Sequence, residues 1–298
     1  MYASPLVSVA IVTYNQKAYL KEAIESILAQ TYENLEIIVA DDCSKDGTQA
    51  LITEYHRRYP NKFVPKFAEK NMGVTANSNE AHKLCTGKYV AWFAGDDLME
   101  PGKIQAQVDF LEKNPDCNIV YHNLRVFDSA TGKHLRYYNG KKDYRTGDVK
   151  VLIKHGTFNG GCSNMVRRIA TPAEGFDMRL PVASDWFFYI NHLINGGTIG
   201  YINEVLGGYR MHESNVTSAS SPFSRQGFQD HLKTCEILLA EHPEFKKEIT
   251  YRLSFIYRGK RKEDYHNDLV KSLRYNPLNF KSAAALLLYH ASFNKIKI

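Results

Sequence analysis

The chain has few cysteines, and their spacing fits neither a metal site nor a disulfide framework. Five cysteines are scattered over 298 residues, and no two of them form a C-x-x-C pair. An odd number without paired spacing is typical of a reduced intracellular protein. The pattern therefore argues against a disulfide scaffold and against a structural zinc site.

Long hydrophobic runs are also missing. No stretch of the sequence reaches the roughly 18 apolar residues of a membrane span, and the first residues lack the charged segment and apolar core of a secretory signal. Internal repeats and low-complexity segments are absent as well. We expect a cytoplasmic protein, either free or peripheral at the inner face of the cell membrane.

Acidic residues become scarce near the C-terminus. Residues 245–298 contain 12 Lys and Arg but 4 Asp and Glu, whereas the whole chain carries a net charge of +6. This basic segment predicts either a surface for anionic lipid or another acidic partner, or simply solvated helix faces. Its lysines accompany no recognisable nucleic-acid-binding motif, so we expect no nucleic-acid partner.

Strand and helix patterns alternate through the first part of the chain. Apolar runs predict strands at 7–12, 35–40, 63–67 and 89–94, and helical spacing predicts helices at 20–28, 48–59 and 74–84. This order implies right-handed crossovers. We predict an α/β fold in which helices flank a mostly parallel central sheet, as in Rossmann-like proteins.

The regular alternation fades after residue 127. Residues 128–147 are polar and predict a loop, and the segment up to residue 212 mixes short strands with one clear helix at 184–194. From residue 223 onward the pattern is helical.

We therefore expect two parts. A first domain over 1–220 divides into halves of about 1–115 and about 116–220. A basic helical extension follows over 221–298, and it is the candidate surface for a membrane or for a homodimer.

Two adjacent acids, Asp96 and Asp97, follow the predicted strand at 89–94. Open α/β sheets bind their ligands at the carboxyl ends of the strands. Carboxylate oxygens at that edge suit Mg²⁺ or Mn²⁺. The simpler alternative is that Asp97 caps the next helix, and the two acids alone leave both readings open.

Further polar motifs follow the other predicted elements in a fixed order. They are Val9-Ala-Ile-Val-Thr-Tyr-Asn15, Asp41-Asp42-x-Ser44-x-Asp46-Gly47-Thr48, Asn71-x-Gly73 with Ala76-Asn77, Ser184-Asp185-Trp186, and Tyr209-Arg210-x-His212. Together with the two acids, this series resembles the family 2 inverting glycosyltransferases of the GT-A type. The resemblance covers roughly residues 5–220. It implies that 1–220 is a catalytic domain, with a nucleotide-binding half of about 1–115 and an acceptor-binding half of about 116–220.

The resemblance implies a site for a nucleotide sugar. Its residues would be Val12, Tyr14, Asp41, Asp42, Asn77, Asp96 and Arg210. Asp42 would accept a hydrogen bond from a pyrimidine ring N–H, which favours a UDP-sugar, or a dTDP-sugar, over cytidine donors. The alternative for both Asp41 and Asp42 is a purely structural role in an Asp-x-Ser turn.

The resemblance also implies the reacting groups. Asp185 would be the general base, and Asp97 with His212 would bind Mn²⁺ or Mg²⁺ beside the leaving diphosphate. The alternatives are an acid that favours a helix N-terminus for Asp185, and a structural histidine for His212. Ser184 stands where many relatives carry a second acid.

The predicted function is therefore a metal-dependent, non-processive hexosyltransferase. It would move a sugar from a UDP-sugar to a glycan or lipid-linked oligosaccharide in bacterial surface polysaccharide synthesis, such as lipopolysaccharide or capsule. The Gln-x-x-Arg-Trp signature of processive relatives is absent. One alternative is a catalytically degenerate scaffold that binds sugar nucleotides. The other is a nucleotidyltransferase, which is disfavoured because residues 13–18 contain no glycine-rich phosphate loop.

Overall fold

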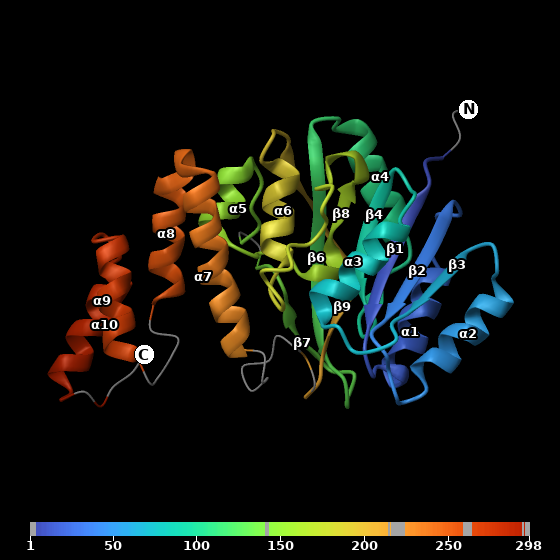
Figure 1. Cartoon of the computed structure of the whole chain (residues 1–298), viewed down its shortest axis with the longest axis horizontal. Helices are drawn as coiled ribbons and strands as arrows, with labels where there is room; N and C mark the ends of the chain where they lie inside the picture. Colours follow the sequence, from blue (N-terminus) through green and yellow to red (C-terminus); the bar gives the residue numbers. More distant parts are fainter. Residues whose placement is uncertain are drawn as a thin grey trace.

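The computed structural model describes residues 4–140, 143–213, 215, 224–258, 264–293 and 295. A curled sheet runs through the centre of the molecule, and helices pack on its faces (Figure 1). Four helices continue the chain away from the sheet, and α9 and α10 lie at the end opposite β2 and β3. The predicted α/β fold class with a C-terminal helical extension is confirmed.

The first half of the sheet is parallel. Its strands stand in the order β3-β2-β1-β4. The elements are β1 (Val7–Thr13), α1 (Lys17–Leu28), β2 (Leu35–Asp41), α2 (Thr48–Arg58), β3 (Phe63–Phe67), α3 (Val74–Leu84) and β4 (Tyr89–Ala94). Each follows the predicted pattern within a few residues, because buried runs and amphipathic helices leave clear periodicities.

The second half of the sheet is mixed, with the order β4-β8-β6-β9-β5. Here β8 is antiparallel to both β4 and β6, whereas β9 runs parallel to β6. The elements are β5 (Leu98–Met99), α4 (Lys103–Lys113), β6 (Cys117–Asp128), β7 (His134–Tyr137), α5 (Val149–His155), η1 (Gly161–Ser163), β8 (Met165–Arg167), η2 (Arg168–Ala170), α6 (Asp185–Leu193) and β9 (Thr198–Met211). The sheet is predicted to be mostly parallel, and its antiparallel pairs lie in this second half.

Three elements of this half differ from the sequence prediction. The predicted loop at 128–147 contains β7, which pairs with β6 although all of its residues are exposed. The short helix α5 was not predicted; the carboxylate of Asp148 caps it by accepting a hydrogen bond from the Lys150 N–H. In place of only short strands, β9 extends over 14 residues.

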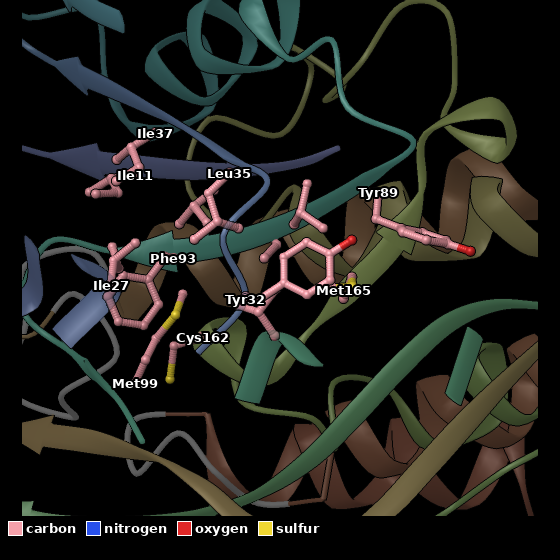
Figure 2. Close-up of a cluster of buried hydrophobic side chains, with 14 of the residues drawn as sticks. Ile11, Ile27, Tyr32, Leu35, Ile37, Tyr89, Phe93, Met99, Cys162 and Met165 are labelled. Atoms are coloured by element: carbon pink, nitrogen blue, oxygen red, sulfur yellow. The ribbon is translucent and has the colours of Figure 1, made fainter. Parts of the chain in front are cut away.

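Two hydrophobic clusters lie on the two faces of the sheet. Alternate residues of β1 face opposite ways, so Val9 and Ile11 belong to one cluster and Ala10 to the other. Figure 2 shows part of the first cluster, where Ile27 and Phe93 lie together beneath β1 and β2. Helices α1, α2 and α4 contribute to this cluster, and α3, α5 and α6 contribute to the other.

The C-terminal helices form two groups. They are α7 (Ser224–Glu241), α8 (Lys246–Ile256), α9 (Tyr265–Tyr275) and α10 (Phe280–Ala291), with the short η3 (Pro243–Phe245) after α7. Helices α7 and α8 share the second core cluster with α6, whereas α9 and α10 form a small cluster of their own. The predicted division at residue 220 lies outside the described residues. Within those residues, no helix is long and apolar enough to span a membrane.

A buried histidine makes the stability of the fold sensitive to acid. His192 donates from Nδ1 to the Phe188 carbonyl at 2.9 Å and accepts at Nε2 from the Thr171 hydroxyl at 3.0 Å. Burial lowers the pKa of His192 to about 4. The unfolded chain takes up this proton near pH 6.5, so stability is lost as the pH falls from 6.5 toward 4.

We expect His192→Gln to flatten the dependence of stability on pH. The wild-type protein should lose about 2 kcal/mol more than the variant between pH 7 and pH 4.5. Urea unfolding at both pH values measures this difference. His134→Gln, on the exposed strand β7, is the control and should behave as the wild type. Equal pH dependence in all three proteins would contradict the assignment.

Candidate functional site

The carboxyl ends of three neighbouring strands meet at one edge of the sheet. The register pairs Thr13 at the end of β1 with Asp41 of β2, and Val12 with Ala94 of β4. The residues that follow these strands carry most of the predicted site. Tyr14 is 46% exposed there, and Val12 is partly exposed just before it. This edge is therefore accessible to a ligand.

Asp41 organises the turn after β2. Its carboxylate accepts hydrogen bonds from the Ser44 N–H at 3.0 Å, from the Gln49 side-chain amide at 2.8 Å and from the Ser44 hydroxyl. The side chain is fully buried. These contacts fix the shape of the loop. They match the alternative in which Asp41 has a structural role in the Asp-x-Ser turn.

Asp42 joins the same loop to the start of α3. Its two carboxylate oxygens accept from the Met72 N–H at 2.7 Å and the Gly73 N–H at 2.8 Å. Each oxygen can accept a further hydrogen bond. Asn77, also predicted for the nucleotide site, is buried and donates to the Ala40 carbonyl at 2.9 Å. Asn77 thus supports β2 from within the fold.

His212 lies on Asp96. Its Nε2 is 2.8 Å from Asp96 Oδ2, and the ring stacks on Tyr19 of α1 with the centroids 4.6 Å apart. Both paired side chains are almost buried. The residues after β9 therefore lie beside the acids that follow β4. The His212 nitrogen and the Asp96 oxygen are two atoms of the kind that bind metal ions.

Asp97 points to different partners. Its Oδ1 accepts from the Arg210 N–H at 2.9 Å. Burial and the adjacent Asp96 carboxylate raise its pKa above the usual range, while Cys162 and the buried Lys103 lie close enough to oppose that shift. Asp97 thus contacts the backbone of Arg210, two residues before His212, while the His212 ring contacts the neighbouring Asp96. A shared metal site of Asp97 and His212 stays a prediction.

Arg210 links α1 and β9 to the loop that contains Asp96 and Asp97. Its guanidinium donates to the Asp96 carbonyl at 2.7 Å and to Glu22 at 2.6 Å. It also lies over the rings of Tyr19 and Phe127 at about 5 Å. These contacts join α1 and β9 to the loop of Asp96 and Asp97. A role of Arg210 in binding the nucleotide sugar stays a prediction.

Sequence reasoning missed Glu22 and Tyr19. Their one signal is a helical spacing of three residues on α1, which places them on the same side of the helix. Many helices show such pairs. This pair belongs to the site because Arg210 contacts Glu22 and His212 stacks on Tyr19.

Asp185 stands at the first position of α6. Its carboxylate accepts from the Trp186 N–H at 2.8 Å, and burial raises its pKa. Tyr138 lies close by: burial raises the pKa of its hydroxyl, and the carboxylates of Asp185 and Asp97 raise it further. Asp185 and the acidic loop therefore share one neighbourhood, with Tyr138 close to both.

The part of the chain that the structure describes holds no group of three or more His, Cys, Asp or Glu side chains able to enclose a metal. Two of the predicted site residues meet through their side chains: Asp96, predicted for the nucleotide sugar, and His212, predicted for the metal. Two protein ligands suffice where a diphosphate completes the coordination, as is usual for Mg²⁺ sites. The donor set fits a divalent cation that is bound together with its nucleotide.

Comparisons with curated proteins identify relatives along most of the chain. A glycosyltransferase of Rickettsia typhi, itself uncharacterised, is 33% identical over 225 residues, which cover 73% of this chain and 67% of that protein. An uncharacterised protein of Mycobacterium tuberculosis is 30% identical over 213 residues, or 70% of this chain. The match spans 60% of the mycobacterial protein's length.

Solved structures share the fold at low sequence identity. TarS of S. aureus in complex with UDP-GlcNAc has a TM-score of 0.68 at 17% identity, over 97% of this chain and 88% of that one. The mannosyltransferase PcManGT from Pyrobaculum calidifontis, in complex with GDP-Man and Mn²⁺, has a TM-score of 0.64 at 18% identity, over 99% and 82%. These similarities establish the GT-A type of fold.

The family model described as "Glycosyl transferase family 2" matches residues 8–171, more than half of the chain. This match covers β1 to η2, and so includes the Asp41–Asp42 turn and the Asp96–Asp97 loop. The chain belongs to glycosyl transferase family 2.

Proposed function

We propose that this protein is a non-processive, inverting glycosyltransferase that moves a sugar from a UDP-sugar to a glycan or lipid-linked acceptor. The observation that carries the proposal is the contact of His212 with Asp96 at the sheet edge, and Asp185 at the first position of α6 supports it. The UDP-GlcNAc complex of TarS supports a uridine donor. An Escherichia coli relative named chondroitin synthase, 29% identical over 215 residues, supports a glycan acceptor.

The nucleoside end of the donor would bind at Val12, Tyr14 and Asp42. The two backbone N–H groups on Asp42 hold its carboxylate at the sheet edge. A uracil ring N–H can donate to the remaining lone pair of an Asp42 oxygen, and thymine offers the same donor. Cytosine lacks this N–H, so a cytidine donor would leave the carboxylate without its ligand partner.

We assign the divalent cation to Asp96 and His212 rather than to Asp97. Asp96 has the imidazole of His212 beside it, whereas Asp97 is engaged with the backbone of Arg210. When bound, Mn²⁺ or Mg²⁺ supplies positive charge to the leaving diphosphate. The Mn²⁺ complex of PcManGT supports this choice of ion.

Asp185 would receive the proton of the acceptor hydroxyl. The acceptor oxygen forms the new bond to the anomeric carbon while the bond to the diphosphate breaks on the opposite face, so the configuration inverts. The Trp186 N–H holds one carboxylate oxygen in place, and the raised pKa makes Asp185 a stronger base than an exposed aspartate. Tyr138 would lie on the acceptor side.

A thermal-shift screen tests the donor class. Saturating UDP-sugar with Mn²⁺ should raise the melting temperature by roughly 5 °C, since binding at 100 times Kd stabilises a fold by about 2.7 kcal/mol. CDP-sugars should give no comparable shift, and dTDP-sugars separate the two remaining donors. Release of UDP in the presence of an acceptor extract then tests transfer.

The outcomes of this screen discriminate the alternatives. No shift with any uridine or thymidine donor would contradict the proposal. A UDP shift without turnover on any acceptor would favour a scaffold that only binds sugar nucleotides. The presence of Asp42, Asp97, Asp185 and His212 at the positions of the family's motifs argues against such a scaffold.

The basic C-terminal segment supports a lipid-linked acceptor. A position at the inner face of the cell membrane would bring the site to such an acceptor during surface polysaccharide synthesis. Residues 245–298 supply the positive charge for contact with anionic lipid.

A further inference from the structure

The last two helices carry large apolar side chains on the outside. Phe280 is 76% exposed, Leu287 71% and Phe293 88%. On α10, residues 280, 284, 287 and 291 recur at helical spacing and form one exposed stripe. We call Phe280, Ala284, Leu287, Leu288 and Ala291 the outer face of α10. Contiguous exposed apolar surface of this kind marks an interaction site.

The inward side of the same helix combines small and polar residues with Leu286 and Tyr289, which pack against Tyr265 and Leu269 of α9. Ser282 and Ala285 are its buried residues. The Ser282 hydroxyl is 2.7 Å from the Ser272 hydroxyl, which donates to the Ser254 carbonyl at 2.6 Å. Asn279 caps the helix and donates to the Ser254 hydroxyl at 2.8 Å.

This arrangement differs from the usual one. A helix on a globular protein buries its leucines and exposes its serines. In α10 the hydroxyl groups and Leu286 hold the helix against α8 and α9, while Leu287 and Leu288 are exposed. The hydroxyl network therefore holds the outer face in one orientation at the end of the molecule farthest from β3 (Figure 1).

The charges on α9, on α10 and on the residues after them are mostly basic. Lys271, Arg274, Lys281 and Lys295 are exposed. The acidic residues of this part of the chain are Asp268, which is buried on α9, and Asp264, which is exposed at the N-cap of α9. An apolar stripe with a basic rim matches a helix that lies in the interface of an anionic bilayer.

A second copy of the chain fits this surface less well. A two-fold contact through α10 would place the same patch of both copies face to face. The basic side chains of both copies would then meet, with Asp264 as the exposed acid of each α9–α10 pair, and this excess of like charge disfavours the contact. Anionic lipid headgroups complement the rim instead.

We propose that the outer face of α10 docks the protein on an anionic membrane surface. The apolar side chains enter the headgroup region, and the lysines and arginine contact the lipid phosphates. This docking depends on the proposed function in one respect: its role would be to bring a lipid-linked acceptor to Asp185. The binding itself needs neither donor nor acceptor.

Sedimentation of the full chain with vesicles tests the proposal. We expect binding to vesicles of equal phosphatidylglycerol and phosphatidylcholine, and little binding to phosphatidylcholine alone. The double variant Phe280→Ser with Leu287→Ser should bind at least tenfold more weakly. The double variant Arg274→Glu with Lys281→Glu should also bind more weakly and lose most of the salt dependence.

Ile169→Ser is the matched control, because Ile169 is 95% exposed on η2, away from α10. It should bind as the wild type. Every substituted residue is exposed, so we expect all variants to retain the fold. Their melting temperatures check this. UDP binding in solution is measured separately, so failure of docking and failure of the proposed transferase activity remain distinguishable.

Three results would overturn the proposal. The first is that the wild type fails to sediment with anionic vesicles, and the second is that the Phe280 and Leu287 variant sediments as well as the wild type. The third is a concentration-dependent dimer in solution that this variant dissociates while vesicles remain unbound. That result would assign the face to a second copy.

Discussion

Asp185→Asn is expected to lower the rate of sugar transfer about 10³-fold while UDP binding stays within about twofold. General base catalysis contributes on the order of 10² to 10⁴ in rate. An asparagine keeps the shape and the oxygen that accepts from the Trp186 N–H, so the start of α6 should remain intact. Initial rates of UDP release, with UDP affinity from calorimetry, measure the two effects independently.

The control for this substitution is Glu174→Gln, an exposed acid on the segment that precedes α6. It should retain full activity. An Asp185→Asn variant with more than a tenth of the wild-type rate would remove Asp185 from the role of base. Equal losses of activity, UDP affinity and melting temperature would instead indicate an acid that only favours the helix N-terminus.

The pH profile gives an independent check on the base. Burial raises the pKa of Asp185, and the base acts only when it is ionised. Activity should therefore rise with pH through a limb that lies above the ordinary aspartate value of about 3.9. The residual activity of Asp185→Asn should lack this limb. Melting temperatures at each pH separate the effect from acid unfolding.

The sequence predicts the first half of the fold well because that half is local. Strands such as β1 are buried on both faces and read as continuous apolar runs. The loops that follow them carry aspartates whose turn chemistry is also local. Asp185 is placed correctly at the start of a helix, because its Ser-Asp-Trp motif directly precedes the apolar face of α6.

The rest depends on contacts between distant residues. β7 is fully exposed, so no apolar alternation reveals it. The partner of His212 is set by the register of β9 against β6, and that register shifts more than once along the pair. A shift by one residue changes which acid a side chain meets. The sequence could therefore predict that His212 meets the acidic pair, but not which acid.

Asp96→Asn should abolish the strengthening of UDP binding by Mn²⁺, a loss of at least about tenfold in affinity, whereas Asp97→Asn should change it little. An amide in place of a ligand carboxylate removes the charge that the cation needs. At position 97 an asparagine oxygen can still accept from the Arg210 N–H. Calorimetry of UDP with and without Mn²⁺ measures the difference for each variant.

His212→Gln provides the second half of this test. It should reproduce the loss seen in Asp96→Asn, because the two side chains meet at 2.8 Å and would share the ion. In the absence of Mn²⁺, all three variants should bind UDP like the wild type. If Asp97→Asn alone removed the Mn²⁺ effect, the ligand would be the acid that the sequence predicts. The Asp96–His212 contact would then serve only to hold β9 against the loop after β4.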